Sequence, residues 1–231
     1  MTEAEWLSER YPGPMLTRLK SRVSARKARL LAVACCRRVW DVMIDDRCRR
    51  AVELAERSAD ELVDESVLDR ASGEAGEAYE ECLDHWEMDQ VGAWPEGPPR
   101  FGWEAHEYAC SAASYVSNTP RVRDEDLIQV FKDTLRSAPA ESDEGPHYCN
   151  LIRDVLGNPF HPVAFNRTWL TSTVVSLAEG IYADRAFDRL PILADALQDA
   201  GCENEDILAH CRGDGPHVRG CWVVDLVLGK S

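Results

Sequence analysis

The sequence predicts an all-α protein. Apolar residues recur at helical spacing along most of the chain, helix-capping residues precede many of these segments, and the alternating pattern of a strand ladder is missing from the sequence. Glycine- and proline-containing stretches separate the segments. Together these observations predict about nine or ten helices, packed as one irregular helical domain.

The helices of the first half are placed by their caps and breakers. Thr2 and Glu5 have the spacing of a capping box, and the sequence Tyr11-Pro12-Gly13-Pro14 is expected to end that first helix. Ser24 is a good cap for the long segment that follows. The expected helical segments cover about residues 2–10, 24–44, 45–62, 66–88 and 103–117.

The second half shows the same signals. Gly157 suits the left-handed residue that ends a helix, and Asn204 suits a helix start. The expected segments are residues 124–136, a helix ending at 156, and residues from 168 or 171 to 183, 188–200 and 205–211. The run 221–228 is apolar except for Asp225, so periodicity alone leaves helix or strand open; we favour a buried helix because the preceding segments are helical.

We expect residues 1–231 to form a single domain. One subdivision is conceivable in the loop 90–102, which is rich in glycine and proline and carries Trp94. The aromatic residues there suggest a loop that packs onto the body rather than a free linker.

Charge and cysteine content narrow the cellular setting. The chain holds 26 Lys and Arg against 41 Asp and Glu, a net charge of −15. This argues against nucleic acid and against an anionic membrane surface as partners, because both attract clustered basic residues. There are nine cysteines, an odd number, and no signal peptide or long apolar run is evident. We therefore expect a cytoplasmic protein with reduced thiols.

Candidate metal ligands gather near the C-terminus. Within twelve residues the chain carries His210, Cys211, His217 and Cys221. Nitrogen and sulfur ligands of this kind suit tetrahedral zinc. However, His210 and Cys211 are adjacent and point in different directions on a helix, and the sequence has no CxxC pair here. The alternative is that the cysteines pack in the core while the histidines form hydrogen bonds in a loop.

The loop from Arg212 to Gly220 is a second candidate site. Arg212, His217 and Arg219 lie among glycines, so they could bind an anion or a partner. The Gly-Lys-Ser/Thr ending of a phosphate-binding loop is missing. A tight connection between two helices is the simpler interpretation.

Function is less constrained than fold. The sequence contains no catalytic triad motif, nucleophile elbow or dinucleotide fingerprint, so a non-enzymatic protein that binds a protein partner is favoured, with no cofactor. Trp94 and Trp103 beside the proline-rich loop could form an anchor surface. The alternative is a metal-dependent (zinc) or anion-dependent enzyme or sensor with its site in the C-terminal loop. His106, four residues before Cys110, is expected to be a packed or surface histidine, and the oligomeric state is open.

The C-terminal segment LPILADALQDAGCENEDILAHCRGDGPHVRGCWVVDLVLGK resembles the same region of a group of planctomycete proteins of unknown function. The stretches RLLAVACCRRVW and LGNPFHPV are similar to other blocks of that group. LADALQDAG also resembles a helix-turn of the ADWLEERGD type found beside repeat proteins in such bacteria. The resemblance implies a bacterial, cytoplasmic protein restricted to that lineage, and it brings no activity with it.

Overall fold

The computed structural model describes residues 1–19, 23–90, 103–117, 122–138 and 142–230, with the side chains of 85–90 and of Trp103 left aside. Most of the described residues are helical and none of them lies in a strand, which confirms the predicted all-α class. They form twelve α-helices and two short 3₁₀ helices. Among these residues, none of the helices is long and apolar enough to cross a membrane.

The chain divides into two compact units. Arg10–Tyr148 form what we call the central unit, and Met1–Glu9 together with Cys149–Ser231 form the terminal unit. The division falls inside one helix, between Tyr148 and Cys149. Of the loop 90–102, where a subdivision is conceivable, residues 91–102 lie outside the described residues.

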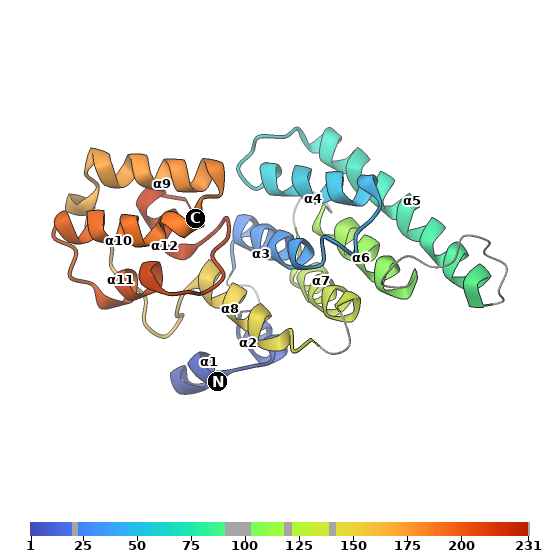
Figure 1. Ribbon diagram of the computed structural model, residues 1–231, viewed down its shortest axis with the longest axis horizontal. Coiled ribbons are helices and arrows are strands. Elements are labelled where there is room, and N and C mark those ends of the chain that lie inside the picture. Colours follow the sequence, from blue (N-terminus) through green and yellow to red (C-terminus); the bar gives the residue numbers. More distant parts are fainter. Residues whose placement is uncertain (20–22, 91–102, 118–121, 139–141, 231) are drawn as a thin grey trace. The chain divides into compact units, whose positions relative to one another are not determined.

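The central unit contains the helices between Arg10 and Tyr148 (Figure 1). They are α2 (Pro12–Leu19), α3 (Ala25–Arg38), α4 (Asp46–Ser58), α5 (Glu65–Gln90), α6 (Trp103–Val116), α7 (Asp124–Ser137) and the start of α8 (Gly145–Leu156). Helix α6 packs against α4, α5 and α7, and α3 packs against α4 and α7. Alanines and cysteines line much of these buried faces, so the helices can approach closely.

The terminal unit is built from the two ends of the chain. Its helices are α1 (Glu3–Ser8), the rest of α8, η1 (Arg167–Trp169), α9 (Ser172–Asp184), η2 (Phe187–Arg189), α10 (Leu190–Asp199), α11 (Glu205–Arg212) and α12 (Trp222–Leu228). Arg153 on α8 holds α1 in place by donating to the carbonyls of Trp6 and Glu9, at 2.7 and 2.8 Å. Helix α10 packs against α9 and α11, and α9 packs against α12.

Most local predictions of helix ends are confirmed. Thr2 forms the capping box, Ser24 and Asn204 cap α3 and α11, and Gly157 has the left-handed φ of 66° after α8. Residues 222–228 are a helix, as favoured.

The predicted number of nine or ten helices is too low. The predicted break at Tyr11-Pro12-Gly13-Pro14 is wrong, because helix α2 begins there, with Pro12 and Pro14. Both prolines lie in its first turn, where a backbone N–H has no intrahelical acceptor, so neither costs a hydrogen bond. The other α-helices correspond to the expected segments, and the two 3₁₀ helices were not predicted.

Candidate functional site

Four side chains of the terminal unit bring metal-ligating atoms together. One atom from each lies within 4.8 Å of the atoms of the other three. The residues are Asp154 on α8, His210 on α11, His217 in the connection after α11, and Cys221 at the start of α12. The group therefore joins three helices and a loop.

Asp154 is the centre of the group. Its side chain is buried, and its Oδ1 lies 2.7 Å from His217 Nδ1 and 3.1 Å from His210 Nε2. The backbone N–H of Val218 donates to the other oxygen, Oδ2, at 3.0 Å. The carboxylate is thus held in place by the chain and directs one oxygen at both imidazoles.

His217 is oriented from both sides. Its Nε2 lies 3.2 Å from the carbonyl oxygen of Gly213, while its Nδ1 faces Asp154. A carbonyl and a carboxylate only accept hydrogen bonds, and a neutral imidazole has a single N–H. Either both nitrogens carry a proton, or Nε2 donates to Gly213 and a cation takes the place of the proton at Nδ1. A backbone carbonyl that fixes the distal nitrogen is a common arrangement for histidines that bind metals.

Cys221 completes the group from the buried side. Its thiol is fully buried, and its Sγ lies 3.2 Å from His210 Nε2. The ring of Trp222 lies 5.1 Å from the His210 ring, centroid to centroid, and shields it in part. Burial, and then the charge of Asp154, raise the pKa of Cys221 well above its ordinary value. A bound cation would reverse this balance, because a coordinated thiol is deprotonated.

The carboxylate and His217 form a strong pair. Burial alone would raise the pKa of Asp154, but hydrogen bonds from His210 and His217 outweigh it and lower that pKa. Burial likewise acts to lower the pKa of His217, and the Asp154 carboxylate outweighs it, so that pKa is raised. Without a metal, the ionised Asp154 carboxylate and a protonated His217 imidazole form a buried ion pair.

Local sequence explains how these elements reach one another. Asn204 caps α11 by accepting from the Ile207 amide at 3.0 Å, which fixes where His210 falls on that helix. Gly157 ends α8 three residues after Asp154. A Cβ added at Gly157 would stand 3.4 Å from the ring of Trp222, so α8 and the start of α12 meet closely at this point.

The predicted metal ligands are partly brought together. His210, His217 and Cys221 lie in the group, whereas Cys211 packs in the hydrophobic core of the terminal unit. Burial raises the pKa of the Cys211 thiol to about 12. Adjacent residues on a helix point about 100° apart, so His210 and Cys211 face different surroundings. Sequence reasoning missed Asp154, and its one local signal was an acid among the buried residues of α8.

The two arginines of the predicted anion-binding loop have protein partners. Arg212 donates to Asp195 and Gln198 at 2.8 and 2.7 Å, and Arg219 donates to the carbonyls of Tyr182 and Ala183 at the end of α9. A pocket of about 310 Å³ lies beside this loop. Its lining includes Arg212 and His217 but also Asp188 and Asp214. The two carboxylates in this lining do not favour an anion.

Comparison with known proteins adds no relative. No protein-family model, no curated protein and no solved structure matches the chain. The resemblance to the planctomycete group therefore stays a prediction. The side chains of Trp94 and Trp103, on which the protein-binding hypothesis depends, lie outside the described residues.

Proposed function

We propose that the protein binds a zinc ion in the terminal unit through Asp154, His210, His217 and Cys221. The observation that carries this proposal is the meeting of four ligand atoms within 4.8 Å of one another. Two imidazoles, a thiol and a carboxylate form a ligand set that suits zinc, whereas magnesium and calcium prefer oxygen ligands alone.

The ligand atoms need to move only a short way to accommodate an ion. Nitrogen and oxygen ligands stand about 3.3 Å apart around tetrahedral zinc, because each lies about 2.0–2.1 Å from the metal. His210 Nε2 and Asp154 Oδ1 are 3.1 Å apart, and His217 Nδ1 and Asp154 Oδ1 are 2.7 Å apart. Small side-chain movements, well below about 1 Å, would open the group to tetrahedral size.

The role of the ion is to hold the terminal unit together. Four protein ligands fill a tetrahedral shell and leave no position for substrate, which is typical of structural zinc. The ligands come from α8, α11, the following loop and α12, so one ion would cross-link elements far apart in sequence. We therefore infer a non-enzymatic metal-binding protein whose folding is linked to zinc.

The test is a zinc titration against a competing chelator, with the full chain. His217→Ala removes one ligand, and His161→Ala is the matched control, since His161 is exposed and pairs with Asp206 at 3.1 Å. We expect His217→Ala to weaken binding at this site by more than about 100-fold, because loss of a ligand should exceed the loss of a supporting partner. His161→Ala should bind like wild type. Equal affinity in all three proteins would contradict the proposal.

A further inference from the structure

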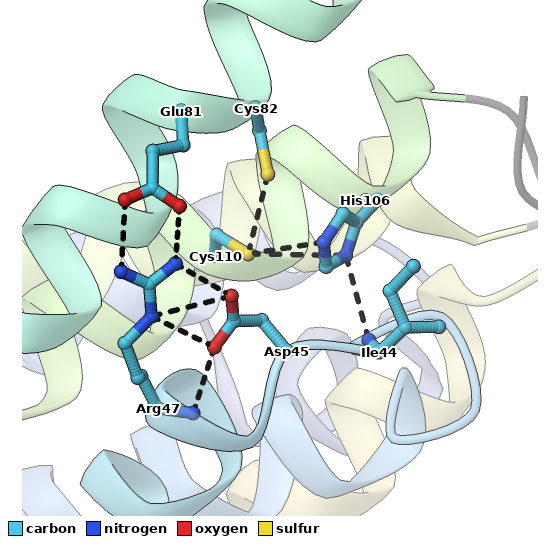
Figure 2. A network of polar contacts seen from close by, with 7 residues as sticks. All are labelled: Ile44, Asp45, Arg47, Glu81, Cys82, His106 and Cys110. Carbon is cyan, nitrogen blue, oxygen red and sulfur yellow. Dashed lines mark hydrogen bonds and ion pairs between the residues drawn. The ribbon is translucent and has the colours of Figure 1, made fainter. Parts of the chain in front are cut away.

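The central unit contains a second group of metal-ligating side chains. Cys82 on α5 and His106 and Cys110 on α6 are all buried, and one atom from each lies within 4.8 Å of the other two (Figure 2). Their meeting follows from the fold, because His106 and Cys110 are four residues apart on one face of α6, and α5 packs against α6. This group shares no residue with the site in the terminal unit.

The distances in this group match tetrahedral zinc. With Zn–S near 2.3 Å and Zn–N near 2.0–2.1 Å, two sulfur ligands stand about 3.8 Å apart, and sulfur and nitrogen ligands stand about 3.6 Å apart. Cys82 Sγ and Cys110 Sγ are 3.9 Å apart, and Cys110 Sγ is 3.7 Å from His106 Nε2. These two distances are therefore close to those between ligands that share one ion.

His106 has a partner that orients its ring. Its Nδ1 lies 3.1 Å from the carbonyl oxygen of Val42, nearer than the Ile44 amide at 3.5 Å. If Nδ1 donates to that carbonyl, Nε2 keeps its lone pair and is free to bind a metal. Cys110 Sγ lies 3.7 Å from Nε2 and 3.8 Å from Nδ1, so the ring would have to turn to direct that lone pair at an ion shared with Cys110. The Val42 carbonyl thus orients the His106 ring, as the Gly213 carbonyl orients the His217 ring.

A third buried thiol lies near this group. Cys48 on α4 is fully buried and acts electrostatically on Cys110. Its sulfur is not among the atoms that meet within 4.8 Å of one another, so it would have to move closer to supply a fourth ligand.

We infer that the central unit binds a second zinc ion through Cys82, His106 and Cys110, with Cys48 moving in as the fourth ligand. The ion would join α4, α5 and α6 beside the surface ion pairs that Arg47 makes with Asp45 and Glu81 (Figure 2). Its buried, thiol-rich ligand set is that of a structural site. The inference stands independently of the proposed terminal site.

The experiment measures zinc per chain in the reduced full-length protein after zinc loading and desalting. The variants are the double substitution Cys82→Ala/Cys110→Ala, the double substitution His210→Ala/His217→Ala, their combination, and Cys35→Ala as the control. Cys35 is a buried thiol of α3 outside both groups. We expect about two ions in wild type and Cys35→Ala, about one in each double variant, and none in the combination.

The outcomes separate the two proposals. If Cys82→Ala/Cys110→Ala retains as much zinc as wild type, the inference is overturned. Loss of zinc only in His210→Ala/His217→Ala would also overturn it, and would leave the terminal site standing. The reverse pattern would overturn the terminal site alone.

A variant that keeps all the ligands of the central unit distinguishes a missing zinc site from a misfolded protein. His210→Ala/His217→Ala loaded with cobalt should show thiolate-to-cobalt charge-transfer absorption, because the thiols of the central unit are unchanged. Its absence from a folded sample, checked by circular dichroism, would overturn the inference.

Discussion

Cys211 and Cys221 allow a matched test of the terminal site. Both thiols are fully buried in the same hydrophobic core, but only Cys221 lies in the ligand group. Replacing either by alanine removes one buried sulfur atom. We expect a similar packing loss, on the order of 1–2 kcal/mol, for Cys211→Ala and Cys221→Ala without metal.

Zinc should separate the two variants. Free zinc at about 1,000 times its Kd stabilises the folded state by about 4 kcal/mol. For a unit of roughly 60–100 residues, each 1 kcal/mol shifts Tm by about 4–8 °C, so the expected shift is about 15–30 °C. Wild type and Cys211→Ala should show this shift in the transition of the terminal unit, and Cys221→Ala should lose most of it.

The assay is differential scanning calorimetry of the reduced full-length chain, with zinc and with a chelator. The informative quantity is the difference in zinc-induced shift between Cys221→Ala and Cys211→Ala, because the packing loss and any effect of zinc on the central unit cancel in it. Equal shifts in the two variants would refute the assignment of Cys221 as a ligand. A loss in Cys211→Ala alone would show that the wrong cysteine has been chosen.

Further predictions concern the scaffold of each unit. Gly157→Ala should destabilise the protein by about 1 kcal/mol or more, because φ at Gly157 is 66° and the new Cβ would press on Trp222. Gly180→Ala should stabilise it by about 0.5–1 kcal/mol, because Gly180 lies within α9 with open space around it. Chemical denaturation measures both changes. Asp133→Asn should raise Tm at pH 7 but not at acid pH. Burial raises the pKa of Asp133 against its hydrogen bonds from Ser111 and Gln129, so the favourable protonated state is lost as pH rises through that raised pKa. Unfolding of both proteins across the acid range checks this, and parallel curves would contradict it.

Local signals in the sequence were sufficient for the fold class and most helix ends. A cap such as Ser24 or Asn204 acts within a few residues of itself, so its effect can be predicted without knowledge of the fold. The failure at Pro12 has the same local origin, since proline is tolerated in a first turn and forbidden only further along a helix. The two 3₁₀ helices were missed because three residues are too few to show periodicity.

The sites were less predictable because they depend on contacts between distant segments. Three of the four proposed terminal ligands are close in sequence, but Asp154 is more than 50 residues away and reaches them only through the packing of α8. Cys211 was included for its position in the sequence, and the turn of α11 directs it into the core. His106 was expected to be packed or at the surface and is buried, but its approach to Cys82 depends on how α5 meets α6.

The central claim is that one zinc ion lies among Asp154, His210, His217 and Cys221. The most direct measurement is a crystal structure of the zinc-loaded protein with anomalous diffraction data on both sides of the zinc absorption edge. We predict an anomalous peak within about 2.0–2.4 Å of one atom from each of these four side chains. Density at this position without an anomalous peak, with His217 Nδ1 still in direct contact with Asp154, would contradict the claim and leave a proton-linked ion pair in its place.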